Sequence, residues 1–293
     1  MTPGFGKTSG TGMAGPSRTN DTIGGRRIRA AFAAAASNGR TALIPYVVAG
    51  YPDARTSFEA ALACADGGAD LLEIGLPYSD PLADGATLQR ASSAALRAGA
   101  SFDRSLELVR RIAEARPHLP LVPMAYANQV LRGGDGRDVA GRLAEAGAAG
   151  VIVADLTPDE GAPFEAAAAG VGIAVVYLVA PTTPPARRAT IAERAGGFLY
   201  CVSLVGVTGA RASLPRSVGR LVREVKAVSP IPVAVGFGVS RSSHVRAIAA
   251  AGADGVIVAS ALVDALGPDG RDVSGLRRLV QSLRGATGAT LGG

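Results

Sequence analysis

The chain contains 293 residues, of which 48% are hydrophobic and 18% charged, and its formal net charge is +6. Such a composition is typical of a globular protein with an ample core, and no uninterrupted apolar stretch is long enough to span a bilayer. The basic residues are mostly arginines scattered along the chain, and aromatic residues make up only 4% of it. These features disfavour a nucleic-acid interface, which requires clustered positive charge and stacking side chains.

The two ends of the chain differ in composition from its middle. Residues 1–25 are rich in Gly, Ser and Thr and lack the apolar core of a secretory signal, so we expect a disordered tail there. The last residues, 285–293, have a similar composition. The length permits either two modest domains or one, but no linker-like stretch interrupts 30–285. We therefore predict a single domain, 26–293.

Eight short apolar runs follow one another along this domain. Several begin after a Gly-rich turn, as in "AGADGVIVAS", which is typical of a helix that ends at Gly and turns into a buried strand. The segments between the runs, such as 55–66, 137–146 and 241–251, are amphipathic and rich in Ala and Arg, which predicts helices. The predicted strands lie within 42–49, 67–75, 120–125, 146–155, 173–180, 195–203, 231–235 and 251–260.

The alternation of strands and helices predicts the overall fold. It implies a parallel sheet, and eight repeats predict an α/β fold of the TIM-barrel kind, a single (β/α)8 barrel with an N-terminal extension. A doubly wound open sheet is the alternative, but no G-x-G-x-x-G follows the first strand. In a barrel, functional residues lie at the carboxyl ends of the strands and in the loops that follow. The candidate positions are therefore Gly50, 73–84, 126–128, Asp155, 203–211, 236–238 and Ser260.

Glu73 stands in the middle of the apolar run "LLEIG". A buried carboxylate is costly unless it is paired or used. An ion pair with a buried Arg is the structural alternative, but no Arg occurs in any predicted strand. Burial raises a carboxyl pKa towards the range where the group can both donate and accept protons. We therefore predict that Glu73 is a catalytic acid and base.

The loop after this strand, "LPYSDPLADG", carries two further carboxylates. Asp80 precedes Pro81, which is ordinary turn chemistry. Asp84 is presented by a loop that Pro77 and Pro81 stiffen. We therefore expect Asp80 to shape the turn and Asp84 to act in the site.

Histidine and lysine residues, which often act in catalysis, do not fall at the predicted carboxyl ends of strands. His118 precedes the third predicted strand and His244 falls in a helical pattern, so both are expected to be surface or capping residues. The lysines are Lys7 in the tail and Lys226 in a helical pattern, so no Schiff base is predicted. With no His or Cys cluster, neither a transition-metal site nor a cofactor is expected.

The two cysteines, Cys64 and Cys201, lie far apart and in no metal-type spacing. We expect both to be small core residues, as in a reduced cytoplasmic protein.

The loops after the last three predicted strands are Gly-rich. "SLVGVTGAR" (203–211) is expected to form either a mobile lid or a plain connection. "GFG" (236–238) and "ASAL" (259–262) follow the seventh and eighth strands, where barrels often bind a phosphate through backbone N–H groups. Turn glycines are the alternative, but the joint placement of the two motifs favours a phosphate site.

These motifs, taken in order, resemble those of the alpha subunit of tryptophan synthase. The resemblance runs from about Ile44 to Ala265 and rests on "PYVVAGYPD", "LLEIGLPYSDPLADG", "AYAN", "VADL", "APTTP", "YCVSLVGVTG" and "GFGVS". It implies retro-aldol cleavage of indole-3-glycerol phosphate to indole and glyceraldehyde 3-phosphate. It also implies a PLP-dependent beta subunit as partner in an α2β2 heterotetramer, without a cofactor in the alpha subunit itself.

The resemblance further implies roles for individual residues. Glu73 matches the general acid and base, and Asp84 matches the carboxylate that handles the indole N–H. Substrate contacts are implied for aromatic and lid residues and for the phosphate loops: Tyr126, Tyr200, Thr208, Gly209, Gly236, Phe237, Gly238, Ala259 and Ser260.

Two positions depart from the family pattern. Ala259 stands where the family usually has Gly, and its methyl group would crowd a phosphate held by the backbone there. "DLTPDE" (155–160) departs from the family's D-L-P-x-E-E in a loop that meets the partner subunit. A stand-alone indole-releasing lyase therefore stays open as an alternative. A non-catalytic regulator that only binds a phosphorylated ligand is the other alternative, which Glu73 and Asp84 argue against.

Overall fold

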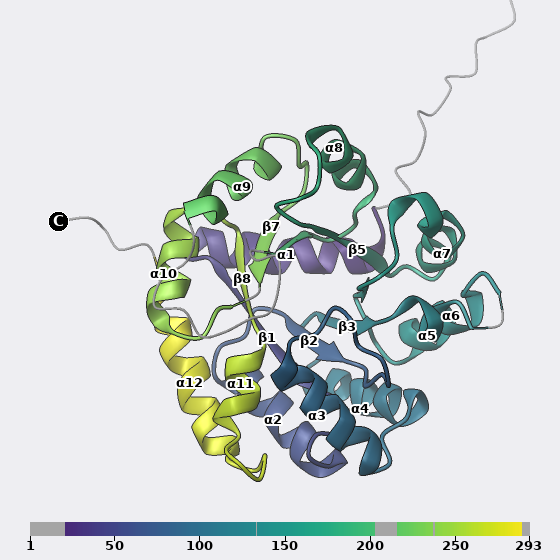
Figure 1. The fold of residues 1–293 in the computed structure, drawn as a ribbon, viewed down its shortest axis with the longest axis vertical. Coiled ribbons are helices and arrows are strands. Elements are labelled where there is room, and N and C mark those ends of the chain that lie inside the picture. Colours follow the sequence, from purple (N-terminus) through teal and green to yellow (C-terminus); the bar gives the residue numbers. More distant parts are fainter. Residues whose placement is uncertain (1–20, 133, 203–215, 237, 289–293) are drawn as a thin grey trace, which may run out of the picture.

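The computed structural model describes residues 21–132, 134–202, 216–236 and 238–288. In this part of the chain eight parallel strands pair in sequence order and close into a barrel (Figure 1). The prediction of a (β/α)8 TIM barrel is therefore confirmed. Seven strands lie within their predicted runs, and β7 extends one residue beyond its run, to Gly236. The strands are β1 (Ala42–Val48), β2 (Leu72–Gly75), β3 (Leu121–Ala125), β4 (Gly150–Val153), β5 (Ala174–Val179), β6 (Leu199–Val202), β7 (Val233–Gly236) and β8 (Gly255–Val258).

Helices surround the barrel, and those predicted at 55–66, 137–146 and 241–251 are found within one residue of each predicted end. None of the helices in the described residues is both long and apolar enough to cross a membrane. The helices are α1 (Ile23–Ser37), α2 (Ala54–Asp66), α3 (Ala86–Arg97), α4 (Phe102–Ala115), α5 (Ala127–Val130), α6 (Arg137–Glu145), α7 (Pro158–Gly170), α8 (Pro185–Arg194), α9 (Arg216–Lys226), α10 (Ser242–Ala250), α11 (Ser260–Ala265) and α12 (Val273–Gly285).

Alternate residues of each strand face the interior of the barrel and the helices outside it. Leu72 and Ile74 of β2 belong to the large apolar cluster that includes core residues of the surrounding helices. Leu71 belongs instead to the smaller cluster formed by the barrel interior. The period of two therefore places Glu73 on the inner face of β2, where it is 1% exposed.

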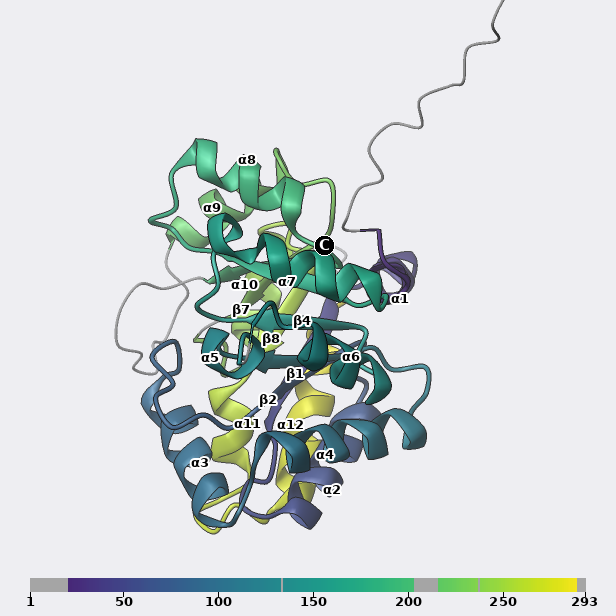
Figure 2. The same ribbon diagram turned by 90° about the vertical axis from the view of Figure 1, so that its right-hand side faces the viewer.

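Helix α1 closes the end of the barrel at which the strands begin. Ile28 and Phe32 are buried among interior residues, and the ring of Phe32 lies 5.6 Å from that of Phe198 between centroids. A Cβ atom at Gly255, the first residue of β8, would lie 2.7 Å from the Phe32 ring, so glycine makes room for this ring. Figure 2 shows α1 on the side of the barrel opposite α5, so the other end is left for the site.

The N-terminal tail is expected from the sequence to extend to residue 25, but the first helix begins before that position. Helix α1 begins at Ile23, and the Thr22 side chain caps it by accepting a hydrogen bond from the Gly25 N–H. Residues 23–25 therefore belong to the helix that plugs the barrel. The tail proposed for residues 1–20 lies outside the described residues and stays a prediction.

Candidate active site

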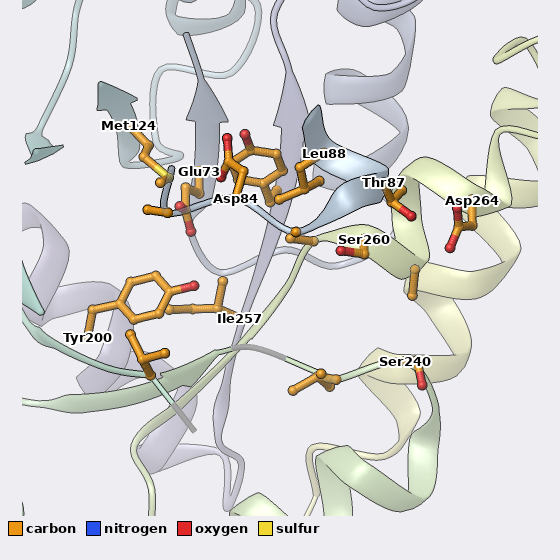
Figure 3. A pocket seen from close by; sticks show the side chains of 18 of the residues that line it. Glu73, Asp84, Thr87, Leu88, Met124, Tyr200, Ser240, Ile257, Ser260 and Asp264 are labelled. Atoms are coloured by element: carbon orange, nitrogen blue, oxygen red, sulfur yellow. The ribbon is translucent and has the colours of Figure 1, made fainter. Parts of the chain in front are cut away.

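A cavity of about 590 Å³ opens at the carboxyl ends of the strands. Inner-face residues of seven strands, all but β7, form its floor, and the loops after β2, β7 and β8 form its walls (Figure 3). Predicted site residues that line it are Glu73, Asp84, Tyr200, Gly238, Ala259 and Ser260. The structure thus brings together the two proposed catalytic carboxylates and the residues proposed to hold phosphate.

Glu73 is fully buried, yet one oxygen of its carboxyl group, Oε2, has no hydrogen-bond partner. Burial, and to a smaller extent the nearby negative charge of Asp84, raises its pKa from 4.5 to about 8. The carboxyl group is therefore mostly protonated at neutral pH. It is free to give that proton to a ligand in the cavity, since no Arg, Lys or His pairs with it among the described residues.

Asp84 reaches the cavity from the loop between β2 and α3. Burial raises its pKa from 3.8 to about 6, and a hydrogen bond from the Tyr126 hydroxyl opposes this rise. At neutral pH, Asp84 is therefore mostly ionised while Glu73 is mostly protonated. Asp80, by contrast, is exposed and its carbonyl accepts the Leu82 N–H in a turn, as predicted.

Contacts with the β3–α5 segment hold the Asp84 loop in place. The Tyr126 hydroxyl accepts a hydrogen bond from the Ala83 N–H at 3.2 Å. The Tyr126 ring stacks on Tyr78, with 5.0 Å between centroids, and the Asn128 amide donates to the Tyr78 hydroxyl at 2.9 Å. Tyr126 does not line the cavity, and these contacts give it a supporting role for the Asp84 loop. Its predicted substrate contact stays a prediction.

Two glycines of the inner face make room for tyrosine hydroxyl groups. A Cβ atom at Gly75 would lie 1.8 Å from the Tyr46 hydroxyl, and one at Gly236 would lie 2.4 Å from the Tyr200 hydroxyl. Gly236 itself does not line the cavity, and it leaves room for Tyr200. Its predicted substrate contact stays a prediction. Burial and the two carboxylates raise the pKa values of both tyrosines, which keeps their hydroxyl groups protonated.

The region predicted to hold phosphate lies between Gly238 and the start of α11. Gly238 has a φ of +76°, a conformation that favours glycine. Ala259 has a φ of −121°, so it does not adopt the left-handed conformation that favours glycine. Ser260 is the first residue of α11, and its side chain lines the cavity. Thr208, Gly209 and Phe237 lie outside the described residues.

Several lining residues were not singled out from the sequence. Tyr46, Met124, Ile152, Leu178 and Ile257 are inner-face residues near the carboxyl ends of their strands. Side chains alternate between the two faces of a strand, so counting every second residue from Glu73 and aligning the strands could have identified them. Thr87, Leu88 and Asp264 line the cavity from helices α3 and α11, for which the sequence gives a weaker signal.

The residues that we excluded from chemistry lie away from the reacting carboxylates. His118 is exposed before β3, and Lys226 of α9 forms an ion pair with Asp254 at 2.7 Å. His244 is buried in α10, where its Nδ1 accepts the Ser240 N–H at 3.3 Å. Both cysteines are buried and free. Among the described residues, no group of three or more His, Cys, Asp and Glu side chains could hold a metal ion.

The altered loop before α7 has a simple local explanation. Thr157 is the N-cap residue of α7, and Pro158 is its first residue, where proline is favoured. Asp159 and Glu160 follow in the first turn, where negative charge is favourable. "TPDE" is therefore a favourable start for α7.

The barrel and the cavity at the carboxyl ends of its strands define the class of protein: a (β/α)8 barrel with a candidate active site at that end. Comparison with known proteins gives the family. The profile of the family described as tryptophan synthase alpha chain matches residues 32–287. The tryptophan synthase alpha chain of Roseiflexus sp. is 44% identical over 261 residues, which are 88% of this chain and 99% of that protein. That of Gloeobacter violaceus is 47% identical over 242 residues, 82% and 86% of the two chains.

Solved structures agree with this assignment. Mycobacterium tuberculosis tryptophan synthase matches with a TM-score of 0.82 and 42% identity, covering 89% of this chain and 98% of that one. A chain of the Pyrococcus furiosus tryptophan synthase α2β2 complex, described as mutually activating, matches with a TM-score of 0.79 and 38% identity, covering 84% and 99%. The chain therefore belongs to the tryptophan synthase alpha chain family.

Proposed function

We propose that the protein cleaves indole-3-glycerol phosphate to indole and glyceraldehyde 3-phosphate, and that Glu73 is the group that moves the protons. The observation that carries this proposal is the unpaired, buried Glu73 carboxyl group on the floor of a cavity large enough for the substrate. Membership of the tryptophan synthase alpha chain family supports the reaction.

The reaction needs one group that first gives a proton and then takes one back. Protonated Glu73 donates its proton to C3 of the indole ring, which places positive charge on the ring nitrogen N1. Glu73, now ionised, accepts the proton of the hydroxyl group on the adjacent carbon of the glycerol chain. The carbon–carbon bond breaks, its electrons restore the indole ring, and the hydroxyl carbon becomes the aldehyde. Glu73 ends protonated, as it began, so a pKa of about 8 suits both steps.

Asp84 supports this step by its charge. An ionised carboxylate near N1 stabilises the positive charge that forms there when C3 is protonated. Its pKa of about 6 keeps Asp84 ionised at neutral pH. Protonation at C3 converts the indole ring to an indolenine. This ring accepts the electrons of the breaking carbon–carbon bond, so the step requires neither a Schiff base nor a metal ion.

The phosphate group is proposed to lie at the other end of the cavity, against the backbone N–H groups near Gly238 and Ala259 and the Ser260 hydroxyl. This arrangement leaves the indole end beside Glu73, Asp84 and Tyr200. Phe237, Thr208 and Gly209 stay predicted substrate contacts. The proposed partner is a PLP-dependent beta subunit in the cytoplasm. The α2β2 complex of Pyrococcus furiosus tryptophan synthase supports the proposed stoichiometry.

Glu73→Gln tests this function directly, because it preserves the shape of the side chain and removes the proton. We expect single-turnover cleavage of indole-3-glycerol phosphate to slow by about 10² to 10⁴, while glycerol 3-phosphate still binds. A variant that cleaves at the wild-type rate would contradict the role of Glu73. Adding the beta subunit separates the alternatives: a stand-alone lyase would show no change in indole release, and a non-catalytic regulator would release none.

A further inference from the structure

The cavity that would receive a phosphorylated substrate is lined by acidic side chains and by no basic ones among the described residues. Three carboxylic acids line it, Glu73, Asp84 and Asp264. Within the described residues, no Lys, Arg or His lines the cavity. Glu73 and Asp84 have roles in the proposed reaction. Asp264 has none, and it lies on the side of the cavity proposed for the phosphate.

Asp264 is placed there by helix geometry. It follows Ser260 by four residues in α11, and residues four apart share one face of a helix. Figure 3 shows Asp264 beyond Ser260 as seen from Glu73, with Thr87 of α3 beside it. The Asp264 carboxylate has no ion pair or hydrogen bond in the described part of the chain, so no neighbouring cation there cancels its charge. Asp264 is exposed at the mouth of the cavity.

We propose that Asp264 is a specificity-determining residue that limits how tightly the protein holds the phosphate end of its ligands. This inference rests on the proposed function, since it requires the phosphate to lie near Gly238 and Ser260. A carboxylate near a bound phosphate weakens binding by Coulomb repulsion, and salt screens the effect at an exposed position. The repulsion acts on the substrate and on the glyceraldehyde 3-phosphate product alike, so it raises KM and favours product release. Indole is neutral, so this repulsion does not affect its binding.

Asp264→Asn tests the proposal through titration of glycerol 3-phosphate by calorimetry. We expect the Kd to fall roughly three- to tenfold in low salt, and this difference to shrink in 0.5 M salt, about a 4–5 Å screening length. Asp264→Glu keeps the charge and should bind as the wild type does. Asp138→Asn is the matched control, because it removes one charge from an exposed position in α6 that does not line the cavity.

Two further measurements separate a charge effect from a change in shape. Indole affinity should be equal in all four proteins, and in Asp264→Asn the KM for indole-3-glycerol phosphate should fall without a rise in kcat. The proposal is overturned if wild type binds glycerol 3-phosphate and Asp264→Asn leaves the Kd unchanged, weakens binding or shows no salt dependence. Wild type that neither binds this ligand nor cleaves the substrate would instead overturn the proposed function itself.

Discussion

Two buried glutamates show how differently the same side chain is used in two regions of the barrel. Glu73 lies on the inner face of β2, and its Oε2 atom has no partner. Glu165 of α7 is 8% exposed on the outside of the barrel. It accepts a hydrogen bond from the Tyr177 hydroxyl of β5 and forms an ion pair with Arg194 of α8 at 2.9 Å. Each oxygen of Glu165 is satisfied, whereas Glu73 is left to react.

The surroundings of each glutamate reflect this difference. A Cβ atom at Gly161 would lie 2.0 Å from the Tyr177 hydroxyl, so glycine allows the tyrosine to reach Glu165 and join α7 to the sheet. In the cavity, Gly75 admits the Tyr46 hydroxyl in a similar way, but no cation accompanies it among the described lining residues. A buried carboxylate that has hydrogen-bond and ion-pair partners is compatible with a stable fold. A buried carboxyl group without such partners has a raised pKa, which suits proton transfer but lowers stability.

The largest expected effect is on stability, and the same substitution, Glu to Gln, is made at each of the two glutamates. Glu165→Gln should destabilise the protein by about 3 kcal/mol, because Arg194 loses its charged partner, with little effect on the cleavage rate of the folded enzyme. Glu73→Gln should have the opposite effect on stability. Denaturant unfolding at pH 5 and pH 9 measures both.

The pH dependence of the Glu73 effect follows from its raised pKa. The folded protein retains this proton up to about pH 8, whereas the unfolded chain releases it near 4.5. The wild type therefore loses stability as pH rises through this window. Glu73→Gln removes that loss, so its advantage should be small at pH 5 and on the order of a few kcal/mol at pH 9. Equal advantages at both pH values would contradict an uncompensated carboxyl group.

The next effect concerns the two aspartates of the β2–α3 loop. Asp84→Asn should reduce cleavage by about 100-fold or more, since a neutral amide does not offset charge at N1. Asp80→Asn is the control in the same loop, because Asp80 is exposed, and it should keep most of the activity. Equal losses in steady-state assays of both variants would show that loop geometry, and not the charge of Asp84, is what matters.

A smaller effect is expected in the pH profile of kcat/KM. Activity requires Asp84 ionised and Glu73 protonated, so it should fall below about pH 6 and above about pH 8. Tyr126→Phe removes the hydrogen bond that lowers the Asp84 pKa. Its acid limb should therefore move to higher pH, with the alkaline limb nearly unchanged. A uniform loss at every pH would indicate only a loosened loop.

The smallest effects are expected at the phosphate end. Because Ala259 has a negative φ, Ala259→Gly should change the affinity for glycerol 3-phosphate by less than tenfold, about 1.4 kcal/mol. Ser260→Ala should weaken binding by a similar or larger factor, because a donor to an anion is lost. A wild type that binds no phosphate ligand, together with an Ala259→Gly variant that does, would show that the methyl group blocks the site.

The sequence predicts the barrel and the placement of Glu73 and Asp84 at the carboxyl ends of its strands, because both depend on local pattern. Apolar runs after Gly-rich turns locate the strands, and an acidic residue inside such a run stands out. What the sequence does not reveal depends on contacts between distant segments. The fit of Tyr46 over Gly75 requires the register of β1 against β2. The role of α1 as a plug requires the closed barrel, and the Glu165 network joins α7, β5 and α8.

The pKa of Glu73 is the measurement that tests the central claim most directly. Infrared difference titration of the carboxyl stretch, with Glu73→Gln to assign the band, measures it in the resting protein. We predict a value of about 8, and a lower value in Asp84→Asn, where the neighbouring negative charge is removed. A Glu73 carboxyl group that titrates near 4.5 in the folded protein would be ionised at neutral pH, and it would contradict the proposal that this residue supplies the proton for cleavage.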